Sequence, residues 1–316
     1  MAGVAFLFPG QGSQKVGMGA ELLEAEGDLL AGYLAQAEAA SGQPVRRRCL
    51  EGPIEALTRT EVAQPALFCV SLAVTDAARA RGLEPDFVAG HSLGEYTAAC
   101  ASGAVSVEDG IELVSLRGRL MGEIGDERPG AMAAVIGLDT ATLRGLCEQA
   151  SDAGTVTLAN INSPTQIVVS GEEDAVVRLM ELAERAGAAR VVRLQVAAAF
   201  HSDLMKPVQE QMADAVGDVA WSEPRVPVAV NARGDLVRDA ESLRTALVDQ
   251  IASPVRWVEC VEALTAAGAE TFLEVGPGRV LGSLVRQIKP GADAFSADAP
   301  ARLEEFAAEH PAAIRR

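Results

Sequence analysis

The pentapeptide Gly-His-Ser-Leu-Gly at positions 90–94 constrains the fold of this chain more than any other feature. It lies between an apolar run at 87–89 and a helix-compatible stretch at 95–101. The order strand, sharp turn and helix around Gly-x-Ser-x-Gly is that of a nucleophile elbow, which exposes the serine hydroxyl at the end of the strand. Glycine is needed two residues before and after the serine because side chains there would collide with the neighbouring strand and helix. The pattern indicates an α/β protein that forms acyl esters on Ser92.

The composition excludes several classes of protein. With 316 residues, 49% of them hydrophobic, the chain is too long for one minimal domain and short for three. No apolar run reaches the roughly 18 residues of a membrane span. The first nine residues lack a basic region and a cleavage site, so we interpret them as a buried strand rather than a signal peptide. The net charge of −17 argues against a nucleic-acid partner, because a phosphate backbone attracts basic surfaces.

The cysteines and histidines bear on location and metals. Five cysteines are odd in number and lie mostly in apolar sequence, which favours a reducing cytoplasm over a disulfide framework. No pair has the spacing of zinc ligands, and there are only three histidines, so we expect no metal site.

Strand-like and helix-like segments alternate along the chain, which favours an α/β class with a largely parallel sheet. Outside the middle of the chain, we expect strands at 4–8, 87–90, 226–231 and 271–275, helices at 64–81, 107–121, 202–216, 242–252 and 255–267, and only a peripheral helix in the tail at 291–316. Ser106 is the expected N-cap of the second helix, with two acidic residues in its first turn.

The middle of the chain has its own order of elements. We expect strands at 131–138, 155–161, 166–170 and 190–196, helices at 140–150 and 172–186, and a turn at 162–164. The order β-α-β-β-α-β is that of a ferredoxin-like unit. We therefore predict a small ferredoxin-like α+β subdomain at 128–198, inserted into a large α/β catalytic domain formed by 1–127 and 199–316.

A serine hydroxyl needs a base within hydrogen-bond reach and donors for an oxyanion. His91 adjoins the serine and should point away from it, and His310 lies in the polar tail. His201 follows an apolar run at 196–200 and precedes Ser202, a natural helix N-cap, so we assign the base to His201. The alternative is a structural histidine at the start of a helix. No acid stands out as a partner for it, but a backbone carbonyl can hold the imidazole in the required tautomer instead.

The glycine-rich turn at 8–14 follows the first expected strand. The backbone N–H groups of Gln11 and of Leu93, the residue after the nucleophile, are the natural pair for an oxyanion hole. The alternative is a phosphate loop, but the turn lacks the Gly-x-x-x-x-Gly-Lys-Ser/Thr pattern.

Arg117 lies among apolar residues on a long expected helix. Arg117 and Arg119 are two residues apart and face differently, so at least one of them points inward. A buried guanidinium needs a carboxylate, because an unpaired buried charge is costly. That carboxylate belongs either to the protein or to a substrate, which a guanidinium would hold with two hydrogen bonds.

Several motifs follow one another in a specific order and spacing. They are Phe-Pro-Gly-Gln-Gly-Ser-Gln at 8–14, Gln-Pro-Ala at 64–66, Gly-His-Ser-Leu-Gly-Glu-Tyr at 90–96, Arg117, residues 160–171, Ala-Phe-His-Ser at 199–202, residues 250–257 and Glu-Val-Gly-Pro-Gly at 274–278. From residue 4 to about residue 289, the chain resembles the malonyl-CoA:acyl-carrier-protein transacylase family and the related acyltransferase domains of polyketide synthases. The resemblance implies a hydrolase-like three-layer core with a parallel sheet, plus the inserted ferredoxin-like subdomain.

The resemblance also implies roles for the residues of the active site. Ser92 would take the acyl group from coenzyme A, with His201 as base and then acid, and the main-chain carbonyl of Gln250 would hold the histidine. Gln11 would supply an oxyanion amide. Arg117 would pair with the malonyl carboxylate.

Two further residues are implied to line the acyl pocket. Gln64 resembles a pocket-lining glutamine, and Phe200 resembles the residue that selects malonyl over methylmalonyl. A bulky side chain near the acyl α-carbon leaves little room for a methyl branch, although such a filter is limited to about 1–3 kcal/mol.

The expected reaction is malonyl transfer from malonyl-CoA to the phosphopantetheine thiol of acyl carrier protein, in fatty acid or polyketide biosynthesis. No cofactor is expected beyond the groups that the substrates carry. Two alternatives stay open: a hydrolase of carrier-bound acyl thioesters, against which Arg117 weighs, and a non-catalytic binding protein. We expect a discrete enzyme, because the first strand begins within a few residues of Met1. We also expect a monomer.

Overall fold

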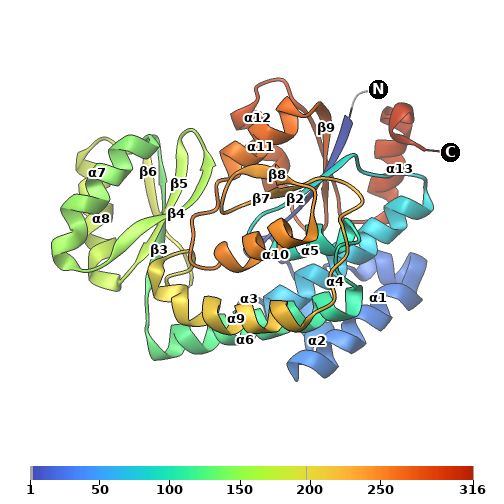
Figure 1. The fold of residues 1–316 in the computed structure, drawn as a ribbon, viewed down its shortest axis with the longest axis horizontal. Helices are drawn as coiled ribbons and strands as arrows, with labels where there is room; N and C mark the ends of the chain where they lie inside the picture. The colour runs from blue at the N-terminus through green and yellow to red at the C-terminus, as the bar shows by residue number, and fades with distance from the viewer. Residues whose placement is uncertain (1–2, 197, 316) are drawn as a thin grey trace.

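The computed structural model describes residues 3–196 and 198–315, so Met1, Ala2, Ala197 and Arg316, which fall within the predicted segments, lie outside the described residues. Two sheets organise the molecule (Figure 1). The larger sheet has the strand order β10-β9-β1-β2-β7-β8. All its neighbouring strands are parallel except β7 and β8, which are antiparallel. The predicted α/β class with a largely parallel sheet is confirmed.

The larger sheet and its helices come from both ends of the chain. Its strands are β1 (Gly3–Phe8), β2 (Phe87–Gly90), β7 (Val228–Val230), β8 (Asp235–Val237), β9 (Ala269–Val275) and β10 (Asp293–Ala297). The helices of its N-terminal part are α1 (Ala20–Ser41), α2 (Val45–Glu51), α3 (Ile54–Thr58), α4 (Thr60–Ala80), α5 (Leu93–Ala101) and α6 (Val107–Glu127). Those of its C-terminal part are α9 (Lys206–Asp218), α10 (Ala240–Asp249), α11 (Trp257–Ala266), α12 (Val280–Ile288) and α13 (Pro300–Glu309).

The smaller sheet lies apart from the larger one, with two helices packed on it (Figure 1). Along the chain its elements are β3 (Ala131–Ile136), α7 (Thr140–Ala150), β4 (Val156–Ser163), β5 (Gln166–Gly171), α8 (Glu173–Arg185) and β6 (Arg190–Arg193). The strand order β4-β5-β3-β6 is antiparallel throughout. The chain order is that of a ferredoxin-like unit, as predicted. The subdomain boundaries at 127/128 and 198/199 stay predictions.

Some predicted elements differ from the structure. The tail at 291–316 holds an edge strand, β10, as well as a helix; the strand is short and contains small and polar residues, which hides it from pattern analysis. Strand β4 continues through Ser163, so the turn falls one residue later than predicted, and β6 ends at Arg193 rather than at residue 196. Ser202 caps a single 3-10 turn by accepting from the Leu204 amide, and α9 begins after that turn.

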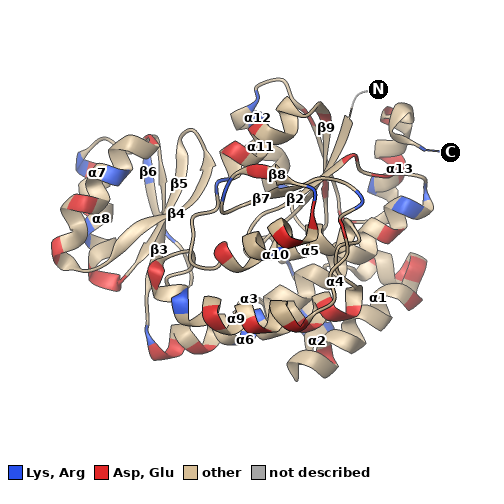
Figure 2. Ribbon diagram, in the orientation of Figure 1, with Lys and Arg blue, Asp and Glu red and all other residues tan. Residues whose placement is uncertain are grey.

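The outer faces of the helices are strongly acidic. Figure 2 shows Asp and Glu residues spread over α1, α6, α8 and α9. These acidic residues contribute to the net charge of −17, and their ionised side chains favour contact with water. Over residues 3–196 and 198–315, no helix has both the length and the apolar composition needed to cross a bilayer.

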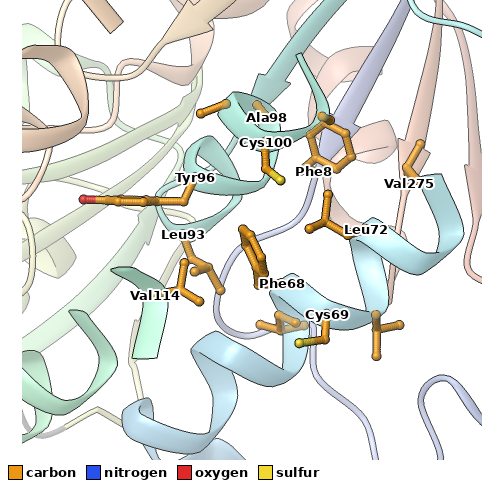
Figure 3. Close-up of a cluster of buried hydrophobic side chains, with 14 of the residues drawn as sticks. Phe8, Phe68, Cys69, Leu72, Leu93, Tyr96, Ala98, Cys100, Val114 and Val275 are labelled. Atoms are coloured by element: carbon orange, nitrogen blue, oxygen red, sulfur yellow. The ribbon is translucent and has the colours of Figure 1, made fainter. Parts of the chain in front are cut away.

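The inner faces of the helices form two apolar layers, one on each side of the larger sheet. Phe6 and Phe8 of β1 belong to a cluster with residues of α4, α5 and α6, whereas Ala5 and Leu7 belong to a cluster with residues of α11 and α12. Figure 3 shows Phe8 near Leu72 of α4, and Phe68 of the same helix near Leu93 of α5, in the first cluster. A strand covered on both faces is apolar without alternation, as β1 is. The predicted three-layer core is therefore confirmed.

The Glu-Val-Gly-Pro-Gly motif has a structural task that its sequence did not reveal. The buried Glu274 side chain at the end of β9 accepts hydrogen bonds from the amides at the start of α12, namely Val280 (3.1 Å), Leu281 (3.1 Å) and Gly282 (3.0 Å). It also accepts from the Ser296 hydroxyl at 3.1 Å. Burial raises the pKa of Glu274, and these four donors oppose that shift. The carboxyl group thus joins β9, β10 and α12.

Replacing Glu274 by alanine should destabilise the protein. The change leaves several buried donors without a partner, so we expect the free energy of unfolding to fall by about 2–3 kcal/mol and Tm by roughly 3–5 °C. Thermal denaturation followed by circular dichroism measures this. Glu270→Ala on the same strand is the control, because Glu270 is exposed and should change stability by less than about 0.5 kcal/mol. Equal melting temperatures for the two variants would contradict the structural task of Glu274.

Candidate active site

Ser92 lies on the sharp turn between β2 and α5, as the Gly-x-Ser-x-Gly pattern predicts. Its backbone has φ 52° and ψ −108°, a conformation that non-glycine residues rarely adopt. A Cβ atom on Gly90 would lie 1.8 Å from the carbonyl of Gly94, and one on Gly94 would lie 2.1 Å from the carbonyl oxygen of Phe8. The predicted need for glycine at both positions is confirmed, because the elbow packs against both its helix and β1.

His201 is the histidine that meets Ser92. The Ser92 Oγ and His201 Nε2 atoms are 2.8 Å apart, although the residues are 109 positions apart in sequence. The His201 Nδ1 atom lies 2.8 Å from the main-chain carbonyl oxygen of Gln250. A carbonyl only accepts hydrogen bonds, so Nδ1 carries the proton and Nε2 presents its lone pair to the serine hydroxyl. His91 points away as predicted, with its Nε2 atom 2.8 Å from the Asn162 Oδ1 atom.

His201 is held in its neutral form. Burial, the larger cause, and the nearby Arg117 charge together lower its pKa to about 3, although the hydrogen bond to the Gln250 carbonyl opposes the shift. The imidazole is therefore neutral at all pH values well above 3, and neutral imidazole is the form that accepts a proton from a hydroxyl.

Arg117 is buried, with 1% of its surface exposed, and points at the nucleophile. One Nη atom donates to the Gln64 Oε1 atom at 2.8 Å, and the other donates to the Gln250 Oε1 atom at 3.0 Å and to the Ser92 Oγ atom at 3.2 Å. These partners are uncharged, and no carboxylate within 3–196 or 198–315 forms an ion pair with Arg117. Of the two alternatives for its partner, the described chain does not supply the internal acid.

Arg119 on the same helix is different. It is exposed and pairs with Glu123 at 3.0 Å. The prediction that Arg117 and Arg119 lie on different faces of the helix is confirmed. Arg119 is therefore a natural control for Arg117.

The turn after β1 packs against the elbow. A Cβ atom on Gly10 would lie 2.4 Å from the main-chain oxygen of His91. Next to it is Gln11, whose side chain donates to the Thr60 Oγ1 atom at 3.2 Å. In the described part of the chain, neither the Gln11 nor the Leu93 amide donates a hydrogen bond to another protein group. Leu93 also begins α5, whose N-terminus favours negative charge.

A cavity of about 1070 Å³ adjoins this cluster. Gln11, Met121 and Phe200 belong to its wall. The Met121 sulfur accepts from the Gln64 Nε2 atom at 3.3 Å, and Gln64 in turn contacts Arg117. Met121 and Gln64 thus connect the cavity wall to the guanidinium. Hydrogen bonds join five predicted site residues in one cluster, namely Ser92, His201, Gln250, Arg117 and Gln64. The predicted residues Gln11 and Phe200 belong to the wall of the adjoining cavity.

Sequence analysis missed two residues of this cluster. Asn231 follows β7, and its side-chain Oδ1 atom accepts a hydrogen bond from the main-chain amide of Ser92 at 2.7 Å. The buried Glu95 side chain accepts a hydrogen bond from the main-chain amide of Asn231 at 3.0 Å. The position of Asn231, at the carboxyl end of an apolar strand, was a usable signal, because the ends of parallel strands meet at one edge of a sheet. Nothing in the sequence distinguishes Glu95 from an exposed residue of a helix's first turn.

A family model described as the acyl transferase domain matches residues 5–297. The chain belongs to this family. This defines the class of protein, an acyltransferase, on a three-layer α/β scaffold.

Several proteins similar to this chain are named for one activity. The malonyl CoA-acyl carrier protein transacylase of Bacillus subtilis is 39% identical over 305 residues, which cover 96% of each chain. A crystal structure of malonyl-CoA:acyl carrier protein transacylase from Xanthomonas oryzae pv. oryzae matches with a TM-score of 0.92 at 39% identity, over 97% of this chain and 98% of that chain. A structure of a malonyl-transacylase in complex with its type II polyketide synthase acyl-carrier protein matches with a TM-score of 0.91 at 38% identity. The match covers 96% of this chain and 98% of that chain.

The depressed pKa of His201 predicts a specific titration behaviour. The ring ¹⁵N signals of His201, assigned with the His201→Ala variant, should stay those of a neutral imidazole with Nδ1–H between about pH 8 and about pH 5. In Arg117→Ala the pKa should rise, because a nearby positive charge is removed. A wild-type titration centred near the ordinary value of about 6.5 would contradict the burial of the ring.

Proposed function

We propose that the protein transfers a malonyl group from malonyl-CoA to the phosphopantetheine thiol of acyl carrier protein through an ester on Ser92. The observation that carries the proposal is the buried Arg117 guanidinium, which lies 3.2 Å from the nucleophile and has no carboxylate partner in the described chain. An acyl group that ends in a carboxylate would supply the missing partner. The malonyl transacylase activity for which the similar proteins are named supports the same substrate.

In the first half-reaction, the Ser92 Oγ atom attacks the thioester carbonyl carbon while the His201 Nε2 atom accepts the hydroxyl proton. Negative charge develops on the carbonyl oxygen, where the amides of Gln11 and Leu93 would donate to it. As the intermediate collapses, the carbon–sulfur bond breaks and His201 returns its proton to the sulfur. Coenzyme A leaves as a thiol, and the malonyl group stays on Ser92 as an ester.

The second half-reaction reverses these roles. The phosphopantetheine thiol of the carrier protein gives its proton to His201 and attacks the ester carbonyl carbon. The bond from the carbonyl carbon to the Ser92 oxygen breaks, and His201 protonates that oxygen. The bound proton is returned in each half-reaction, so the enzyme ends each turnover unchanged.

Substrate selection would rest on charge and on size. Arg117 favours an acyl group with a free carboxylate over acetyl, because a charge-assisted pair in a buried site is strong. Phe200 lines the cavity and limits the space for a branch at the α-carbon. The reaction would serve fatty acid or polyketide biosynthesis, with the enzyme acting as a monomer. A cytoplasmic location fits the described chain, in which the cysteines form no disulfide.

Mass spectrometry of the intact and digested protein tests the proposal. After mixing with malonyl-CoA, the malonyl group should be found on Ser92, and Ser92→Ala should carry none. Holo acyl carrier protein should then remove the group at least tenfold faster than buffer does. A malonyl ester that buffer removes as quickly as the carrier protein would indicate the hydrolase instead.

Arg117→Ala should lose malonyl transfer and gain relative tolerance of acetyl-CoA. Truncating one partner of a buried charge pair costs about 2–5 kcal/mol, roughly 30-fold to several-thousand-fold in kcat/KM for malonyl-CoA. Competition between malonyl-CoA and acetyl-CoA, read as the ratio of the two adducts, measures the change in preference. Arg119→Ala on the exposed face of the same helix should keep the wild-type ratio. An unchanged ratio in Arg117→Ala would rule out pairing with the carboxylate.

A further inference from the structure

The side chain of Asn231 bridges the two ends of the elbow. Its Oδ1 atom accepts the Ser92 amide at 2.7 Å, and its Nδ2 atom donates to the Gly90 carbonyl at 2.7 Å. Strand β7, which ends one residue earlier, pairs in parallel with β2 up to Ala89. Where the backbone of β2 turns away from its neighbour, the amide side chain of Asn231 thus continues the hydrogen-bond ladder.

A second layer holds Asn231 and the other side of the serine. The Glu95 Oε2 atom accepts hydrogen bonds from the main-chain amide of Asn231 at 3.0 Å and from the Gln250 Nε2 group at 3.4 Å. Gln250 Nε2 also donates to the Ser92 carbonyl at 2.9 Å. The amide and the carbonyl of Ser92 and the carbonyl of Gly90 are therefore all held by side chains from other elements.

This network explains how the strained serine persists. A non-glycine residue at a positive φ costs about 1–3 kcal/mol and is retained only when its surroundings over-determine it. The same Gln250 holds the His201 ring through its main-chain carbonyl. One set of contacts thus fixes the position of the nucleophile relative to the base.

The charge state of Glu95 fits this task. Burial raises the pKa of Glu95 more than the surrounding groups, chiefly the Asn231 main-chain amide and the Arg117 charge, lower it, and the resulting pKa is about 8. At neutral pH the group is mostly a neutral acid. It therefore orders its neighbours without cancelling the Arg117 charge that the malonyl carboxylate needs.

We propose that Asn231 and Glu95 are positioning residues that hold Ser92 in the elbow conformation required for acyl transfer, acting through the backbone of residues 90–92 and through Gln250. Neither is expected to touch the substrate. The effect of these residues on the rate of malonyl transfer rests on the proposed function. Their effect on the rate at which a fluorophosphonate probe labels Ser92 does not.

The Asn231 variants test the bridge. Asn231→Ala removes it, and Asn231→Asp keeps the acceptor for Ser92 but places an oxygen against the Gly90 carbonyl. Both should lower the rate of fluorophosphonate labelling and of malonyl transfer about 100-fold, since small misplacements of reacting groups cost that much. Binding of malonyl-CoA, measured in a Ser92→Ala background, should change less than about threefold. Asp235→Ala, at the exposed first position of β8, is the control and should label at the wild-type rate.

The Glu95 variants separate geometry from charge. Glu95→Gln keeps a neutral group with an acceptor for the Asn231 amide, so its labelling rate should stay within about threefold of wild type. The labelling rate of Glu95→Ala should fall about as far as that of Asn231→Ala. Normal labelling in Asn231→Asp or in Glu95→Ala would overturn the inference, and thermal denaturation confirms that each compared variant is folded.

The outcomes keep the two proposals apart. A wild-type protein that labels with the probe but transfers no malonyl group contradicts the proposed function and leaves the labelling comparison valid. A wild-type protein that transfers malonyl, with Asn231→Asp equal to it in both assays, contradicts the positioning role alone.

Discussion

The architecture depends on keeping one serine in a backbone conformation that it would not adopt alone. The elbow at Ser92 closes only because glycine at positions 90 and 94 lets β1, β2 and α5 approach within van der Waals contact. The larger sheet then delivers the remaining parts: the turn after β1 brings Gln11, and the turn after β7 brings Asn231. Strain at the nucleophile is thus balanced by packing and hydrogen bonds from several neighbouring elements.

The electrostatics of the site follow from burying one positive charge among neutral partners. Amide oxygens of Gln64 and Gln250 hold Arg117 in place without neutralising it, and Glu95 is kept mostly protonated by burial. The same charge, together with burial, keeps His201 neutral. A site of this kind prefers an anionic acyl group, because only that group restores charge balance in a low-dielectric environment.

Prediction from the sequence was strongest where a local motif has a single physical solution. The elbow, the α7 boundaries, the Ser106 cap and the ferredoxin-like order all follow from periodicity and turn chemistry, and the structure bears them out. Weak local signals failed: β10 is short and mixed in composition, and the helix expected from residue 202 begins with a separate 3-10 turn. Glu274 appeared only as part of a motif, and its role as a cap for α12 depends on a strand and a helix meeting in space.

By itself, the sequence determined that Ser92 is the candidate nucleophile and that His201 is the candidate base. Gly-x-Ser-x-Gly between a strand and a helix, and a choice among three histidines, leave few alternatives. Only the tertiary structure decided what surrounds Arg117, where the Gln250 carbonyl points and that Asn231 and Glu95 bind the elbow. These facts are distances between residues far apart in the chain. They are set by strand order and helix packing, which no local pattern encodes.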